Sequence, residues 1–400
     1  MATLLRRRSA LGGLVALSGV VLSAAVASSA RTSLAFDVVW VVLVAGVAFL
    51  SSREQRVAHP VLARAALSLV VVDTALYLTY FFSAPVNTNV AIGAAMAIVL
   101  LGLSLLTGSS GQISLGNGAF MGVGAFTVAI WANHHRTTPI VVVLVLAVIA
   151  GALVGLLLGL PATRLRGPYL AGMTLAFAVA FGAILTTFSS WTGGDSGLQM
   201  PTVTNAPQWL ISLLAPGTTQ LSYDSVWLAD IAVVTTGVAL FFMANLFASR
   251  TGRAMRLIRD NDVAAELVGI SLPRTRVIAF TVSAAYAALG GALWTIINNS
   301  VSPSTYTFAL SVTILSLVVI GGIGTIPGAI IGGIIYAFSS NSIAWFTAQT
   351  GLNPQGNLAS QLNGIIFGVL LIVTIIFAPM GIAGAFRHLA RTFTASRFKR

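Results

Sequence analysis

Polar side chains that could contact a solute lie inside two glycine-rich segments of an otherwise apolar chain. The first segment, residues 106–126, reads LTGSSGQISLGNGAFMGVGAF and holds Gln112, Ser114 and Asn117. Such groups can hydrogen-bond a zwitterionic or amide solute where a broken helix exposes backbone inside a membrane. Small residues at this spacing also let helices approach closely, which accounts for many of the glycines without any solute.

The second segment, residues 319–333, reads VIGGIGTIPGAIIGG. Pro327 interrupts a helix, and the glycines before it permit an unwound turn. We expect both segments to be broken or re-entrant helices, a form tolerated at membrane depth only inside protein or beside a water-filled cavity. The predicted translocation path is Gln112, Ser114, Gly116, Asn117, Gly118, Gly321, Gly322, Gly324 and Thr325.

Residues for catalysis are missing from the chain. It has no cysteine, its four histidines are scattered, and its one lysine is Lys399, so neither a metal site nor a phosphate-binding GxxxxGK[ST] loop is expected. The two glutamates, Glu54 and Glu266, lie in predicted loops, and no GxSxG or HExxH motif occurs. We expect no catalytic residue and no bound cofactor, and any dependence on ATP must come from another subunit.

One acidic residue, Asp73, is assigned to the middle of an apolar span, ALSLVVVDTALYLTYFF. An ionisable group at that depth is a candidate proton relay or ion ligand. The alternative is a protonated carboxyl, or one hydrogen-bonded inside the bundle to a neighbour such as Thr74 or Tyr77. A proton-coupled secondary carrier using Asp73 therefore stays open as a less favoured function.

The elements that position these residues follow from composition. Hydrophobic side chains make up 57% of the 400 residues and charged ones 8%, with a mean hydropathy of +0.94, which excludes a water-soluble enzyme. Residues 74–135 and 277–386 contain no Asp, Glu, Lys or Arg, and one crossing takes about 20 apolar residues. Because the runs do not alternate, a β-barrel is excluded. The predicted fold is an all-α polytopic transmembrane bundle of about 10–12 spans.

The apolar runs place these spans along the chain. They are predicted at 9–30, 34–51, 64–83, 89–107, 112–132, 139–160, 168–190, 226–248, 275–297, 308–322, 328–346 and 360–380.

Basic residues indicate the orientation. With a cytoplasmic N-terminus, 19 of the 21 basic residues fall on the cytoplasmic side, and only Arg31 and Arg136 fall outside. Both termini are therefore predicted to be cytoplasmic, and the net charge of +12 needs no nucleic acid to explain it. The first span also resembles a signal peptide with a cleavage site near Ala25–Ala27, and cleavage stays open.

Three connections lie outside the predicted spans. The external loop 191–226 is long and proline-containing, and the tail 386–400 is basic. The cytoplasmic loop 249–276 is predicted to form one or two short helices joined by a turn. Its arginines at i, i+3 spacing present a basic face, and Met255, Ile258 and Leu267 offer apolar contacts to a partner.

Several long motifs in order then resemble one family. These are LTGxxGQISLGxGAF, SRTGRAMRLIRDNDVAAELVGI running into AFTVSAAYAALGGALW, VIGGIGTIPGAIIG and FAPMGIAG. Together they are similar to the permease subunits of branched-chain amino-acid ABC importers, in the LivM-like branch. The resemblance implies a permease domain at 85–385, preceded by N-terminal helices at 1–84 and followed by the tail.

The resemblance also implies a role for the cytoplasmic loop. Ala264, Ala265 and Gly269 fit the AAxxxG part of the importers' coupling motif, whereas Val263 stands where the general motif has Glu. A short helix here is expected to dock on an ATPase. The residues assigned to ATPase coupling are Arg253, Arg256, Asp260, Asn261, Ala264, Ala265, Glu266 and Gly269.

The implied function is inward transport of leucine, isoleucine or valine by alternating access in a bacterial inner (plasma) membrane. The implied partners are a second, similar permease, two cytoplasmic ATPases, an external solute-binding protein, the small-molecule solute and the lipid membrane. Urea, short amides or other amino acids are the alternative substrates, and the sequence leaves homodimeric and heterodimeric pairing both open.

Overall fold

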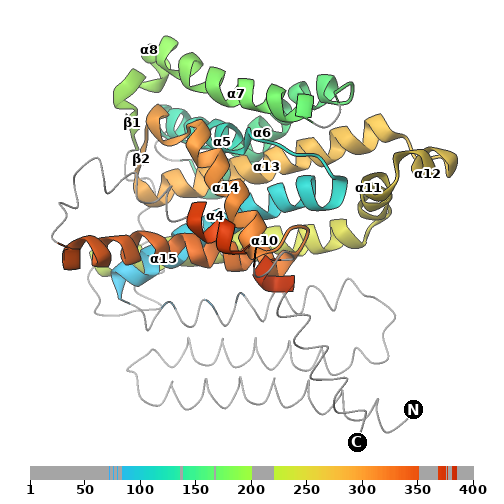
Figure 1. The fold of residues 1–400 in the computed structure, drawn as a ribbon. Helices are drawn as coiled ribbons and strands as arrows, with labels where there is room; N and C mark the ends of the chain where they lie inside the picture. Colours follow the sequence, from blue (N-terminus) through green and yellow to red (C-terminus); the bar gives the residue numbers. More distant parts are fainter. Residues whose placement is uncertain are drawn as a thin grey trace, which may run out of the picture. The chain divides into compact units, whose positions relative to one another are not determined.

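The computed structural model is helical and describes residues 72, 75, 79, 83–135, 138–165, 168–200, 220–350, 368–374, 376 and 381–384 (Figure 1). The long helices are α4 (Ala84–Leu103), α5 (Asn117–His134), α6 (Ile140–Ala162), α7 (Pro168–Thr187), α10 (Gln220–Ala248), α13 (Leu272–Asn298), α14 (Phe308–Gly321) and α15 (Ile326–Thr350). The short ones are the π-helix η2 (Ser104–Ser109), α8 (Ser189–Thr192), η3 (Gly194–Ser196), α11 (Arg250–Asp260), α12 (Asp262–Leu267) and η4 (Pro303–Thr305).

The chain divides into two compact units. One takes Met1–Thr88 and Thr204–Asn245, and the other takes Asn89–Val203 and Leu246–Arg400. Both glycine-rich segments and the loop 249–276 belong to the second unit, so the candidate site is contained within one unit.

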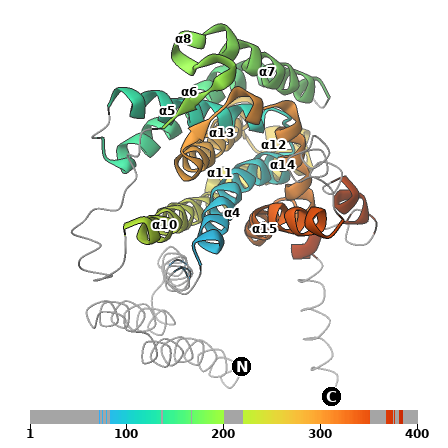
Figure 2. The same ribbon diagram turned by 90° about the vertical axis from the view of Figure 1, so that its left-hand side faces the viewer.

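Helix α13 packs against α4, α5 and α6 through small residues. A Cβ on Gly102 of α4 would lie 2.8 Å from the Ser283 carbonyl, and one on Gly124 of α5 would meet the Ala288 backbone. Figure 2 shows α13 lying between α4 and α5. These close approaches replace side-chain interdigitation with backbone contact, as expected for helices in a membrane.

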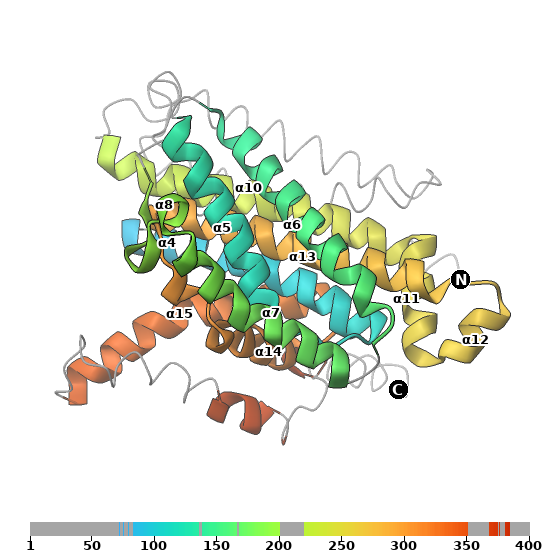
Figure 3. The same cartoon turned by 90° about the horizontal axis from the view of Figure 1, so that it is seen from above.

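Helix α6 has a small-residue face and a bulky apolar face. Gly151 and Gly155 lie against Ala288 and Ala284 of α13, and Figure 3 shows the two helices running side by side. The other face exposes Val141, Val145, Leu153, Leu157 and Leu160. Large apolar residues outside and small ones inside reverse the soluble pattern, so lipid is the environment that this face fits.

A two-stranded antiparallel sheet lies at the end of the unit opposite the loop 249–276 (Figure 1). Strand β1 (Leu198–Gln199) pairs with β2 (Ser300–Val301), with Leu198 opposite Val301. Two further hydrogen bonds hold this end: Met200 N donates to Asn299 O at 2.9 Å, and Asn133 Nδ2 donates to Gln199 O at 3.3 Å. The beginning of the long predicted loop 191–226 is therefore ordered against α5 and α13.

The predicted all-helical membrane fold is confirmed. Within the described part of the chain, five helices are long and apolar enough to cross a membrane, counting α4 and η2 as one. The predicted spans from 139–160 to 328–346 each coincide with a helix, although α10 begins at Gln220 rather than 226. The predictions for 9–30, 34–51 and most of 64–83 and 360–380 lie outside the described residues, as does Asp73.

Candidate functional site

The first glycine-rich segment is a broken helix. After η2 the chain leaves helical geometry, Gly111 has a left-handed φ of 70°, and α5 does not begin until Asn117. The predicted start of a span at residue 112 is therefore wrong. A residue with positive φ interrupts the helical hydrogen-bond ladder, so the next helix can begin only after the turn.

The second segment is broken as well. Helix α14 ends at Gly321, and Gly322 and Gly324 have positive φ angles of 124° and 73°. Thr325 Oγ1 donates to Gly322 O at 2.9 Å and accepts from Gly328 N at 3.0 Å, which caps the first turn of α15. The expected unwound turn before Pro327 is confirmed.

The two breaks touch each other. Gly108 in η2 lies directly against the backbone of Gly324, and a Cβ on Gly108 would overlap that backbone. Ser104 Oγ accepts a hydrogen bond from Gly324 N at 2.9 Å. Two segments far apart in the sequence therefore form one non-helical junction inside the bundle.

The polar side chains predicted for the path lie in different places. Gln112 Nε2 donates to Ser110 Oγ at 3.0 Å and to the Arg276 carbonyl at 3.4 Å, at the end of the loop 249–276. Ser114 is fully buried, and its Oγ accepts from Gly116 N at 3.3 Å. Asn117 is also buried, and within the described residues its Nδ2 has no hydrogen-bond partner. Asn117 Oδ1 accepts from Ser114 Oγ at 3.4 Å, so the Nδ2 group is the part of Asn117 left with hydrogen-bonding capacity.

Two glycines of the predicted path serve helix packing. Gly116 lies against the Thr174 carbonyl of α7, and Leu115 N donates to Thr174 Oγ1 at 2.9 Å. Gly118 N donates to Ser311 Oγ of α14 at 2.9 Å. These contacts fix the start of α5 between α7 and α14.

The loop 249–276 forms the two predicted short helices, α11 and α12. Ser249 caps the first, with its Oγ accepting from Gly252 N at 3.2 Å, and Asn261 caps the second, with its Oδ1 accepting from Ala264 N at 3.0 Å. Gly269, with a φ of 82°, ends the motif, and Gly269 N donates to Glu266 O at 2.9 Å. Asn261 and Gly269 thus have local structural roles at the two ends of α12.

The apolar residues of this loop divide into two groups. Met255, Ile258 and Ala265 are buried within the chain, so the expectation that Met255 and Ile258 offer contacts to a partner is wrong. They fill the core beneath α11 because their side chains point inward from an amphipathic helix. Leu267 is 83% exposed, and Val263, Val268 and Glu266 are exposed beside it. These four residues form the free surface of α12.

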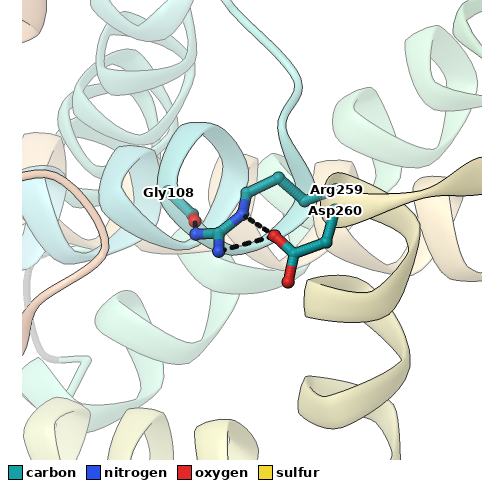
Figure 4. A network of polar contacts seen from close by, with 3 residues as sticks. All are labelled: Gly108, Arg259 and Asp260. Carbon is teal, nitrogen blue, oxygen red and sulfur yellow. Dashed lines mark hydrogen bonds and ion pairs between the residues drawn. The ribbon is translucent and has the colours of Figure 1, made fainter.

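Three arginines of α11 each bond a different carbonyl. Arg253 Nη1 donates to Ala248 O at 2.8 Å, and Arg256 Nη2 donates to Phe247 O at 3.1 Å, both at the end of the preceding helix. Arg259 Nη1 instead donates to Gly108 O at 2.5 Å (Figure 4). Three of the arginines predicted to form a basic face therefore bond carbonyl groups at the ends of α10 and η2.

An ion pair joins α12 to α13. Arg276 Nη2 lies 2.6 Å from Asp262 Oδ2, and the Arg276 side chain is 15% exposed. A cavity of about 370 Å³ lies between this pair and the first break, and Gln112, Arg259 and Asp260 also line it. Sequence reasoning did not assign Arg259, Asp262 or Arg276 to the site, although their charge next to a helix break was a usable signal.

A second acidic residue lies within a span and was missed. Asp230 belongs to the span Asp224–Ala248, and Thr79 Oγ1 donates to Asp230 Oδ1 at 2.8 Å. Asp73 was therefore not the only acidic residue in an apolar helix. The signal was present, because Asp230 already fell inside the predicted helix 226–248.

Two broken helices in contact, joined by Arg259 to the helix pair α11 and α12, are the geometry expected of a transport protein. Residues 88–375 match the family described as "Branched-chain amino acid transport system / permease component". The chain belongs to this permease family. It is consequently a multi-pass membrane protein of the transport permease type.

Curated relatives agree with the permease family. The LivM permease protein of the high-affinity branched-chain amino acid transport system of Salmonella typhimurium is 30% identical over 314 residues, 74% of this chain and 69% of the relative. LivM of Escherichia coli is 31% identical over 302 residues, 71% and 67% of the two chains. The LivH permease protein of Salmonella typhimurium is 24% identical over 313 residues, 76% and 96% of the two chains. No solved structure matches.

Proposed function

We propose that this chain is the permease subunit of an ATP-binding-cassette importer that moves leucine, isoleucine and valine inward. The identity to LivM over about two thirds of that protein supports the substrate class. The observation that carries the proposal is the physical connection between the two helix breaks and the α11–α12 helices through Arg259. A transporter driven from the cytoplasm needs such a connection, because the energy source and the solute path are in different places.

The partners are a second permease of the family, two cytoplasmic ATPases and an external solute-binding protein. Similarity to both LivM and LivH supports a paired permease. The exposed surface formed by Val263, Glu266, Leu267 and Val268 is where an ATPase would dock. ATP is hydrolysed by those subunits and no cofactor is held by this chain. Both termini lie in the cytoplasm of a bacterial cell, and the chain lies in its inner membrane.

The solute path runs past the junction of the two breaks. Asn117 supplies a buried amide with free hydrogen-bonding capacity, and the turn from Gly321 to Thr325 supplies backbone groups that a helix would otherwise occupy. Alternating access then means that ATP binding shifts the equilibrium between an outward-open and an inward-open bundle. The chain performs no covalent chemistry.

The test is uptake into proteoliposomes that contain this chain, the partner permease, the ATPases and a binding protein. We expect radiolabelled leucine to accumulate only with internal ATP, and collapse of the proton gradient to have no effect. Accumulation of urea instead of leucine would overturn the substrate. Uptake by this chain alone, driven by protons and lost in Asp73→Asn, would overturn the importer assignment.

A further inference from the structure

Arg259 contacts two residues at the start of the first helix break, Gly108 and Gly111. It lies near the end of α11, and its guanidinium Nη1 donates to the Gly108 carbonyl at 2.5 Å (Figure 4). Its aliphatic stem lies over Gly111, where a Cβ would be 2.9 Å from Arg259 Cγ. One side chain of α11 therefore lies over the point at which the chain leaves helical geometry.

Whether the Gly108 carbonyl can accept this bond depends on the conformation of the first helix break. Gly108 lies near the end of the π-helix η2, and the last carbonyls of a helix lack helical partners and carry partial negative charge. A guanidinium is the strongest donor available for such a group. Single π-helical turns occur often at functional sites because their hydrogen-bond register can change locally. A change of register in η2 would remove this acceptor.

The neighbourhood leaves Arg259 able to move. Its Nε and Nη2 donate to Asp260 Oδ1 at 2.9 and 2.8 Å, and the Arg259 and Asp260 side chains are 42% and 61% exposed. The cavity of about 370 Å³ lies directly beside them. Asp260 is the next residue in the chain, so it moves together with Arg259. The bonds to Asp260 can therefore persist while the bond between the guanidinium and the Gly108 carbonyl breaks and re-forms.

The first helix break, which Arg259 contacts, is also in contact with the second helix break. Gly108 lies against Gly324, and Ser104 in the same π-helix accepts from Gly324 N at 2.9 Å. A shift of α11 relative to η2 would therefore displace groups that contact both non-helical segments. Arg253 and Arg256 differ, because they bond the end of the helix that directly precedes α11.

We propose that Arg259 is the positioning residue that transmits movement of the coupling helices to the two helix breaks. The proposal rests on the proposed function, because it takes the ATPases as the source of the movement. Arg259 touches neither ATP nor solute in this scheme. Its removal should separate ATP hydrolysis from transport rather than abolish both.

The experiment measures uptake and ATP hydrolysis in the same proteoliposomes of the complete transporter. We expect Arg259→Gln to keep hydrolysis and to lower solute transported per ATP about tenfold, which corresponds to about 1.4 kcal/mol of coupling. Arg259→Lys should lie between wild type and Gln, because an ammonium keeps the charge but lacks the planar fork that bonds Gly108 and Asp260 together. Arg274→Gln, a change at an exposed arginine at the start of α13, should match wild type.

Three results would overturn the proposal. Wild-type stoichiometry in Arg259→Gln would show that the bond transmits nothing. Parallel loss of uptake and hydrolysis in an assembled complex would show that Arg259 serves only docking or folding. If Arg259→Gln does not assemble, Arg259→Lys carries the test, and a wild-type ratio there would contradict it. Absence of ATP-dependent uptake in the wild type is a separate result, which would refute the proposed function and this proposal with it.

Discussion

Ser104 accepts a hydrogen bond from the backbone N–H of Gly324 at 2.9 Å, across 220 residues of sequence. This bond fixes the register between the π-helix that follows α4 and the turn that separates α14 from α15. Since Gly108 touches the same turn, the two breaks cannot move independently without separating these groups. Ser104, Gly108 and Gly324 therefore form one junction that joins the two breaks.

Removing the Ser104 hydroxyl should destabilise the junction. Ser104→Ala leaves the Gly324 N–H without its acceptor, and an unsatisfied buried donor costs about 1–3 kcal/mol. We expect a lower melting temperature and reduced ATP-driven uptake. Ser316→Ala is the control, because the Ser316 hydroxyl bonds the Val312 carbonyl of its own helix. Equal effects of the two substitutions would contradict the proposed importance of the Ser104 bond.

Adding a methyl group at Gly108 should force the breaks apart. A Cβ there would overlap the Gly324 backbone, which cannot rotate away as a side chain can. We expect Gly108→Ala to cost about 1–3 kcal/mol in thermal stability, the usual range for overpacking, and to abolish uptake. Gly172→Ala in α7 meets nothing within 4 Å and should be tolerated. A stable, active Gly108→Ala protein would show that the contact is not tight.

The packing of α6 on α13 predicts a graded glycine series. A Cβ at Gly155 would lie 2.5 Å from Ala284 Cβ, whereas one at Gly159 would lie 3.5 Å from Phe280 Cβ, an ordinary contact. Gly155→Ala should therefore lower the melting temperature. Gly159→Ala should leave it unchanged or raise it, because Ala favours a helix over Gly by about 1 kcal/mol. The reverse order would argue against this helix pairing.

Substitutions at Leu267 and Ile258 should have different effects, the first on ATPase binding and the second on the stability of the permease. Leu267 is 83% exposed, so Leu267→Ser should leave the permease stable but weaken ATPase association. Loss of one buried Leu contact, about 1.5–3 kcal/mol, would raise the dissociation constant roughly ten- to hundredfold. Ile258 is 3% exposed, and Ile258→Ser should destabilise the permease itself. Unchanged ATPase affinity in Leu267→Ser would remove α12 as the docking helix.

Asn117 should lower the thermal stability of the protein while contributing to solute uptake. Its Nδ2 is buried without a partner in the described structure, and burying an unpaired N–H group costs about 1–3 kcal/mol, which outweighs the long 3.4 Å bond that its Oδ1 accepts from Ser114 Oγ. Asn117→Leu, of similar volume, should therefore match or exceed wild-type thermal stability while uptake falls. Reduced stability together with reduced uptake would indicate a structural role for Asn117 and would argue against its place in the path.

The sequence by itself determined which elements form. Apolar runs determine spans because a bilayer leaves backbone groups no partner except their own helix, and Gly111, Gly324 and Pro327 mark the breaks because these residue types act within a few neighbours. The caps of Ser249 and Asn261 on α11 and α12 are local in the same sense. Such features depend on short-range backbone geometry, which is written in consecutive residues.

Only the tertiary structure decided which elements meet. Spacing predicted one basic face for the arginines of α11, yet Arg253 caps its neighbouring helix while Arg259 reaches Gly108. Periodicity likewise did not show that Met255 lies inside. These outcomes depend on the relative placement of helices distant in the sequence. Similar apolar helices offer many pairings of nearly equal composition, and close packing between particular small residues selects one of them.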